Sequence, residues 1–372
     1  MGLSRRMKNR KTVFLTGSTG LVGSYLLKIL LQNDCKVYAL ARRKDNKDAR
    51  ARVIDVLKFW DKKTLPKKFT NLVVLEGDIA KENLGLSKKT IDLLKKEIKE
   101  IFHCAAVTEF NWPLEDIRKI NVEGTRNVLD LAVQCYRKGN FKKVSHISTA
   151  YVCGDHKGTF RETDLDVGQR FNTTYEQSKF EAEKLIQQYR KKGLWIDIFR
   201  PPFIIGESKT GKTIAFRQGF YQLLHIWNLE IFDYFPGKEY FMDIVFVDDL
   251  CKAILNISFE SSNSNKNYHP FGCKTAPFGT ILDISSKFLG FKKPRLVTRH
   301  RFLKINPTPV QKMILNNNIF LFNSNVKLHS KLTNDFLKNF GFKFLNFNKM
   351  FLLRSLRYCL STNFLKRERI LY

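Results

Sequence analysis

Three glycines spaced three residues apart place the tightest limits on what this chain can fold into. They lie in T-G-S-T-G-L-V-G, residues 16–23, between a short apolar run and a run with apolar residues at helical spacing. Such a loop between a strand and a helix is typical of dinucleotide-binding folds, because its backbone can approach a pyrophosphate and the helix amides then face the phosphates. In this interpretation Gly17 permits the turn, Gly20 admits the pyrophosphate and Gly23 lets helix and sheet pack closely. The alternative is a turn whose glycines serve packing only.

Apolar runs and helical patterns alternate through the first 200 residues. Continuous apolar strands that alternate with helices indicate a parallel sheet covered on both faces. The fold class is therefore α/β, a doubly wound Rossmann sheet whose ligands bind at the carboxyl ends of the strands. We predict strands over 12–17, 36–41, 71–78, 98–106, 141–152 and 195–200, and helices over 21–33, 114–139 and 175–193.

After about residue 205 the alternation becomes irregular, with helical patterns over 213–228 and 278–289 and a short strand within 243–250. We find no flexible linker, and so expect a cap built onto the sheet domain. The predicted parts are a basic N-terminal extension over 1–10, a Rossmann NAD(P)-binding domain over 11–205, and a smaller substrate-binding subdomain over 206–372, partly interleaved with the sheet.

The end of the second predicted strand bears on which dinucleotide binds. Arg42 and Arg43 follow it, where an NAD site usually carries an acid for the ribose hydroxyl. Guanidinium groups suit the additional 2′-phosphate of NADP. We therefore expect NADP(H), with NAD(H) as the alternative because two arginines are unremarkable in a chain of net charge +30. Asp78 and Ile79, after the third predicted strand, are placed to border the adenine.

Tyr175 and Lys179 lie four residues apart in YEQSK, so a helix presents both on one face. A tyrosine pKa near ~10 is too high for acid–base work at neutral pH, and a nearby ammonium lowers it. Such a phenol could protonate an oxyanion as a carbonyl is reduced. The alternative is an ordinary solvated start of a helix.

Eight segments between about residues 11 and 255 occur in a characteristic order: VFLTGSTGLVGSYLLKILL, LARRKDNKDARARV, GDI, IFHCAAVTEFNWPLEDIRKINVEGTRNVLDLA, VSHISTAYVCGD, YEQSKFEAEKLI, IFRPPFIIG and IVFVDDL. In this order they resemble the extended short-chain dehydrogenase/reductases. The glycine loop and the Tyr/Lys pair are shared by that whole superfamily. HCAA with NVEGT, and STAYV, resemble more narrowly the thioester reductase and fatty acyl-CoA reductase branch. The C-terminal third carries little resemblance.

The resemblance implies roles for individual residues. Thr149 would hydrogen-bond the substrate oxygen, Tyr175 would donate the proton and Lys179 would bind the nicotinamide ribose. Arg42 and Arg52 would face the 2′-phosphate. The other implied cofactor-binding residues are Gly17, Thr19, Gly20, Leu21, Val22 and Gly23 in the glycine loop, and Asp78, Ile79, Ala105, Ala106 and Pro202 at the ends of later strands.

The function implied is NADPH-dependent reduction of an acyl thioester, carried on coenzyme A or on an acidic carrier protein, to an aldehyde or further to an alcohol. Two other classes stay open. A sugar-nucleotide epimerase or dehydratase, or a sterol-type alcohol dehydrogenase, would use the same three side chains. A cofactor-sensing binding protein would keep the fold without the activity.

Charge and cysteine usage bear on partners and compartment. The chain carries 65 basic and 35 acidic residues, a surplus that attracts polyanions and would suit a carrier protein or coenzyme A phosphates. No nucleic-acid-binding signature accompanies the charge, so we expect no nucleic-acid partner. Seven cysteines without a C-x-x-C pair, and histidines without metal-site spacing, favour a cytoplasmic protein with no metal site.

The C-terminal segment over 350–372 places Leu353, Leu356 and Leu360 at helical spacing among basic residues. Two interpretations are open: the helix docks on its own domain, or it lies on an anionic membrane surface. No apolar run approaches the ~18 residues that a membrane-spanning helix needs.

Overall fold

The computed structural model describes residues 11–61, 70–110, 112–216, 219–238, 240–260, 264–272, 276–317 and 326–366. Everything below concerns these residues. The basic extension over 1–10 and the end of the C-terminal segment, over 367–372, lie outside them.

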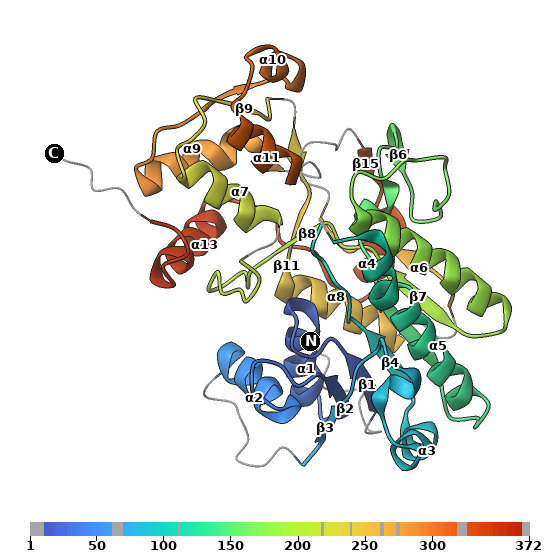
Figure 1. Ribbon diagram of the computed structural model, residues 1–372. Helices are drawn as coiled ribbons and strands as arrows, with labels where there is room; N and C mark the ends of the chain where they lie inside the picture. Colours follow the sequence, from blue (N-terminus) through green and yellow to red (C-terminus); the bar gives the residue numbers. More distant parts are fainter. Residues whose placement is uncertain are drawn as a thin grey trace.

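A seven-stranded sheet forms the centre of the molecule, and its strands lie in the order β12-β7-β5-β4-β1-β2-β3 (Figure 1). All neighbouring pairs are parallel. The doubly wound fold and the six predicted strands are thus confirmed, whereas the two-residue β12 is too short to leave a pattern in the sequence. The strands are β1 (Thr12–Thr16), β2 (Lys36–Ala41), β3 (Leu72–Glu76), β4 (Glu100–His103), β5 (Lys143–Ile147), β7 (Ile196–Phe199) and β12 (Asn267–Tyr268).

Helices cover both faces of the sheet, because successive residues of each strand point to opposite sides. Val13 and Leu15 of β1 pack with α1 (Leu21–Gln32), α2 (Ala49–Trp60) and α8 (Val247–Glu260). Phe14, between them, packs on the other face. The helices of that face are α3 (Lys88–Glu97), α4 (Leu114–Asn121), α5 (Glu123–Tyr136) and α6 (Thr174–Lys191). The single helix predicted over 114–139 is therefore two, which meet at Val122.

The chain beyond residue 205 builds a second lobe with its own apolar core, above the sheet in Figure 1. The predicted helix over 278–289 is confirmed as α9, and the one over 213–228 contains α7. α8 and β12 return to the sheet, which supports the proposed interleaving of the two parts. The remaining elements are η2 (Glu82–Gly85), η3 (Ala150–Cys153), β6 (Gly158–Phe160), β8 (Phe203–Ile205), α7 (Gly219–Asn228), β9 (Tyr234–Pro236), β10 (Phe241–Met242), β11 (Ile244–Phe246), β13 (Ala276–Pro277), α9 (Phe278–Leu289), β14 (Arg295–Val297), α10 (Arg299–Lys304), α11 (Pro309–Asn317), β15 (Val326–Leu328), α12 (Lys331–Lys338) and α13 (Lys349–Ser361).

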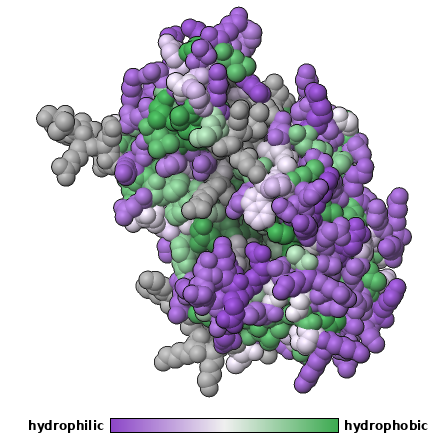
Figure 2. Space-filling model, in the orientation of Figure 1, coloured by the Kyte–Doolittle hydropathy of each residue, from purple (hydrophilic) through white to green (hydrophobic). Residues whose placement is uncertain are grey.

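The C-terminal helix α13 packs against α9 in this second lobe. Leu352 and Leu356 are fully buried in its core, and Leu353 and Leu360 are half-buried. The helix thus docks on its own lobe through Leu352 and Leu356. Within the described residues, no helix combines the length and the apolar character needed to cross a membrane. Figure 2 shows hydrophilic residues over much of the visible face, with hydrophobic residues gathered in the central hollow and over parts of this lobe.

Candidate active site

A cavity opens at the carboxyl ends of β1 to β4, where the strand order reverses between β1 and β4. Nine of the predicted cofactor-binding residues line it: Gly17, Thr19, Gly20, Arg42, Arg52, Asp78, Ile79, Ala105 and Ala106. Five others do not: Leu21, Val22 and Gly23 lie in the first turn of α1, Pro202 follows β7, and Lys179 lies on α6. The sequence did not single out Leu40, Ala41, Gly77, Cys104, Val107 and Ile120, which complete the lining.

The three glycines of the loop are needed for different reasons. Gly17 has φ 69°, and a Cβ there would lie 2.6 Å from the Ala105 nitrogen. A Cβ on Gly23 would lie 2.1 Å from the Gly17 carbonyl oxygen. A Cβ on Gly20 would approach no described atom closer than 3.4 Å, so protein packing does not require a glycine there.

The bare Cα of Gly20 therefore fits close approach by a ligand in the cavity. Gly20 is also the N-cap of α1, and no side chain caps this helix. The first amides of a helix have no partner within it, so they remain free to bind a pyrophosphate. The residues of the loop thus fit a dinucleotide.

Gly20→Ala is expected to weaken NADPH binding by about tenfold or more, which corresponds to a free-energy loss of about 1.4 kcal/mol. The midpoint of thermal unfolding should change little, because the added methyl meets only ordinary contacts within the protein. Gly23→Ala is the matched control and should destabilise the fold by about 1–3 kcal/mol, because its Cβ collides with backbone. Fluorescence titration with NADPH and thermal unfolding of both variants test this; unchanged NADPH affinity in Gly20→Ala would contradict it.

Two guanidinium groups meet at one side of the cavity. Arg52 Nη1 donates to the Arg42 carbonyl oxygen at 2.5 Å, and Nη2 donates to Thr19 Oγ1 at 3.4 Å. Arg42 Nη1 lies 3.7 Å from Asp78 Oδ2. Burial, and next the charge of Arg42, lower the pKa of Arg52. The charge of Asp45 opposes this effect on Arg52, and of the two arginines only Arg42 lies within ion-pair distance of Asp78. The Arg52 guanidinium at the cavity suits a phosphate.

Thr149 and Tyr175 meet at the carboxyl end of β5. Thr149 lies two residues after the end of β5 and is buried, and its Oγ1 accepts a hydrogen bond from the Tyr151 amide at 3.3 Å. Thr173 caps α6 by accepting from the Glu176 amide at 3.2 Å, which fixes Tyr175 in the first helical turn. The Thr149 side chain lies close enough to the Tyr175 phenol to lower its pKa. Two of the three predicted catalytic side chains are therefore neighbours in the structure.

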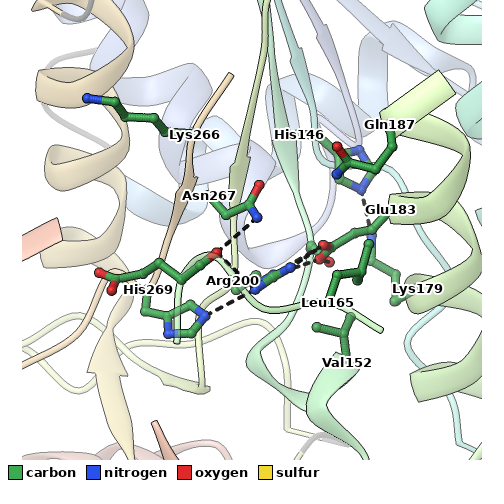
Figure 3. Close-up of polar contacts among 12 residues, drawn as sticks. His146, Val152, Leu165, Lys179, Glu183, Gln187, Arg200, Lys266, Asn267 and His269 are labelled. Carbon is green, nitrogen blue, oxygen red and sulfur yellow. Dashed lines mark hydrogen bonds and ion pairs between the residues drawn. The ribbon is translucent and has the colours of Figure 1, made fainter. Parts of the chain in front are cut away.

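Lys179 lies one turn further along α6, with only 2% of its surface exposed. Its Nζ donates to the Ile147 carbonyl oxygen at 2.8 Å and lies 3.3 Å from His146 Nε2 (Figure 3). Burial lowers the pKa of Lys179 to about 8, against the opposing charge of Glu183. Its ammonium also acts on Cys104, which lines the dinucleotide cavity. Lys179 therefore acts on the cavity wall through its charge, although it does not line the cavity.

The expectation that Lys179 lowers the pKa of Tyr175 was wrong for this structure. Burial raises the pKa of Tyr175 to about 12; the hydrogen bond with Thr149 lowers it and the charge of Glu176 raises it. The reason is that the ammonium of Lys179 is bound to the end of β5. A phenol with this pKa stays protonated at neutral pH, which is the form that can donate a proton during a reduction.

Asn121 was not among the predicted site residues, although it lies in the NVEGT motif. Its side chain accepts from the Val107 amide at 2.8 Å, and donates to the Val107 carbonyl at 3.0 Å and to Ser178 Oγ at 2.9 Å. It thereby ties the loop after β4, which lines the cavity, to the helix that carries Tyr175 and Lys179. The sequence did carry a signal for Asn121, because it is a polar residue within the NVEGT motif.

A buried ion pair between Arg200 and Glu183 lies next to the end of β5. Arg200 Nη2 lies 2.7 Å from Glu183 Oε2, and neither side chain has any exposed surface (Figure 3). Glu183 Oε1 also accepts from Ser148 Oγ at 2.6 Å. Ser148 precedes Thr149, so this pair helps to fix the strand end that carries the Thr149 hydroxyl.

Comparison with known proteins gives the same fold and a family. The family described as Male sterility protein matches residues 15–254. A linear gramicidin synthase protein of Brevibacillus parabrevis is 28% identical over 272 residues, which are 70% of this chain but 5% of that protein. The chain thus spans only a small part of this curated relative.

Two solved structures share the fold across almost the whole chain. The terminal R domain of the myxalamid PKS-NRPS pathway is 24% identical with a TM-score of 0.82, covering 98% of this chain and 94% of that one. A thiolation-reductase di-domain from an archaeal non-ribosomal peptide synthetase is 20% identical with a TM-score of 0.79, covering 96% and 76%. With more than half of its residues matched by the family, this chain belongs to the Male sterility protein family, within the NAD(P)-dependent oxidoreductases of the extended short-chain dehydrogenase/reductase type.

Proposed function

We propose that this protein is an NADPH-dependent reductase of acyl thioesters carried on a carrier protein or on coenzyme A. The observation that carries the proposal is the pairing of Thr149 with Tyr175, with Lys179 one helical turn away and its charge acting on Cys104 in the wall of the dinucleotide cavity. Family membership supports it, because similar proteins include reductase domains of peptide and polyketide synthetases.

When bound, the reduced nicotinamide supplies the hydrogen and electron pair that reduce the thioester carbonyl carbon. The Thr149 hydroxyl donates to the carbonyl oxygen as negative charge grows on it. The Tyr175 phenol then gives that oxygen its proton. The resulting hemithioacetal breaks its carbon–sulfur bond and releases an aldehyde and a thiol, so that one carbonyl consumes two electrons and two protons.

The charge balance of the chain supports an anionic thioester carrier. With 65 basic and 35 acidic residues, the protein attracts acidic partners. Both an acidic carrier protein and the phosphates of coenzyme A meet this requirement. Attraction of this kind weakens as salt screens the charges, so the KM for the carried thioester should rise with ionic strength.

The proposal is tested by mixing the protein with NADPH and thioesters of the same acyl group on coenzyme A and on a carrier protein. Oxidation of NADPH together with release of free thiol is the expected result. Turnover of a free alcohol or a nucleotide sugar, without oxidation of NADPH by either thioester, would instead favour the epimerase or alcohol dehydrogenase alternative.

We propose NADP(H) rather than NAD(H) because Arg42 and Arg52 adjoin each other at the cavity. Arg52→Ala should raise the KM for NADPH by about 10- to 100-fold, since hydrogen bonds between charged groups contribute about 1.5–3 kcal/mol. The KM for NADH should change by less than about threefold, because NADH lacks the 2′-phosphate. Steady-state kinetics with NADPH and with NADH measure both KM values. An equal rise in the two KM values would count against binding of the 2′-phosphate by Arg52.

A further inference from the structure

A second cavity is lined by chain neighbours of Thr149 and Tyr175. Tyr151, whose amide donates to Thr149, lines it together with Glu176, which follows Tyr175 in the chain. Asp243, between β10 and β11, also lines it. None of the described residues in its wall lines the dinucleotide cavity, so the two cavities are distinct.

The lining of this cavity is mainly apolar, yet it holds two acids. Phe203, Val326 and Leu328 contribute apolar surface, and Phe241 is 54% exposed at its edge. None of the described residues in the wall is basic, although the chain has a net charge of +30. The described wall of this cavity thus carries two carboxyl groups and no basic side chain, in a protein that is otherwise strongly basic. Such a cavity should prefer a ligand with a positive charge.

The two acids differ in what they already bind. The Glu176 carboxylate accepts from the Asn172 amide at 2.8 Å, and its own amide donates to Thr173, so it is used in starting α6. The Asp243 carboxylate has no hydrogen bond or ion pair with any described residue; only its backbone carbonyl is bound, by the Phe203 amide at 3.2 Å. Burial raises the pKa of Asp243 to about 6, so at neutral pH it is mainly ionised.

Asp243 also acts on Tyr151, whose amide donates to Thr149. Burial, and next the charge of Asp243, raise the pKa of Tyr151 well above its ordinary value, with smaller contributions from Cys153, Glu176 and Tyr175. An acyl group in this cavity would therefore meet the Asp243 carboxylate next to the residues that flank Thr149 and Tyr175.

We propose that this second cavity binds the acyl part of the thioester, and that Asp243 selects acyl groups that carry a positively charged amino group. The inference rests on the proposed function. A plain fatty acyl chain would leave the Asp243 carboxylate desolvated and unpaired, which is unfavourable. An ammonium group on the substrate would instead donate a charge-assisted hydrogen bond to the Asp243 carboxylate. The cavity thus favours an aminoacyl or peptidyl thioester over a fatty one.

The test uses N-acetylcysteamine thioesters of hexanoate, 2-aminohexanoate and 6-aminohexanoate, which share one carbon skeleton. Oxidation of NADPH is measured for the whole chain and for Asp243→Asn, which keeps the shape and removes the charge. The wild type should turn over at least one amino compound with kcat/KM about tenfold or more above that of hexanoate. In Asp243→Asn this preference should fall to about twofold or less, while turnover of the hexanoyl thioester persists and shows that the variant is folded.

The outcomes separate this inference from the proposed function. Turnover of none of the three thioesters, on these carriers or on coenzyme A and a carrier protein, refutes the proposed function itself. A wild type that reduces the hexanoyl thioester at least as well as both amino compounds overturns the selection by Asp243 and leaves the reductase proposal standing. This comparison of substrates uses the wild type alone, so it does not depend on how well any variant folds. A preference that survives in Asp243→Asn likewise overturns the role of Asp243.

Discussion

Tyr175→Phe is expected to lower kcat by about 10²- to 10⁴-fold, the usual contribution of a positioned proton donor. The phenol adjoins the Thr149 hydroxyl, and burial raises its pKa to about 12, so it is protonated throughout the neutral range. Without it, the oxygen of the reduced carbonyl must take its proton from water, which has little access to a buried site. The affinity for NADPH should stay within about twofold, a change below 0.5 kcal/mol, because Tyr175 does not line the dinucleotide cavity.

The matched control is Tyr189→Phe on the same helix. Tyr189 also carries a buried phenol, and it donates to Asp130 Oδ1 at 2.6 Å, away from the two cavities. Loss of the Tyr189 hydroxyl should lower the free energy of unfolding by about 1 kcal/mol and leave kcat unchanged. Steady-state rates and NADPH titration of both variants decide the matter. Full activity in Tyr175→Phe would remove the proton donor from the proposed mechanism.

The sequence predicted the sheet and many residues of the cavity beside the glycine loop, because both depend on local patterns. Strand, glycine loop and helix follow one another without interruption from Thr12 to Gln32, and their chemistry is fixed by backbone geometry at Gly17 and Gly20. The carboxyl ends of parallel strands meet at one edge, which places Asp78 beside the loop. The prediction for Ala105 came from the family resemblance, and the structure places Ala105 in the same cavity.

The second cavity could not be predicted in the same way. Its walls come from Tyr151, Phe203, Asp243 and Leu328, which are brought together by short strand pairs such as β8 with β11 and β6 with β15. Strands of three residues leave no periodic signal, and their pairing depends on long-range packing. The pKa of Tyr175 was misjudged for a related reason: a helical spacing shows which residues share a face, but not which partner a long lysine side chain chooses.

Arg200→Met is expected to destabilise the protein by about 3–5 kcal/mol, the usual cost of leaving one member of a buried ion pair unpaired. Arg200 Nε lies 3.1 Å from both carboxylate oxygens of Glu183, and its Nη1 lies 3.4 Å from the Glu162 carbonyl oxygen and 3.5 Å from His269 Nε2. Without the guanidinium, the Glu183 carboxylate keeps the Ser148 hydroxyl but no cation in contact. Denaturant unfolding, followed by fluorescence, measures the loss.

The double variant Glu183→Leu with Arg200→Met separates stability from positioning. Replacing both members of a buried pair by apolar residues is often neutral or stabilising, so the double variant should be more stable than Arg200→Met alone. Its kcat should nevertheless fall, because Ser148 loses its partner beside Thr149, and Lys179 loses the carboxylate that favours its charge. A double variant with native stability and native kcat would show that the Glu183–Arg200 pair only fills space and does not position Thr149. One with native stability and a lowered kcat would instead show that the ion pair holds the catalytic strand end in place.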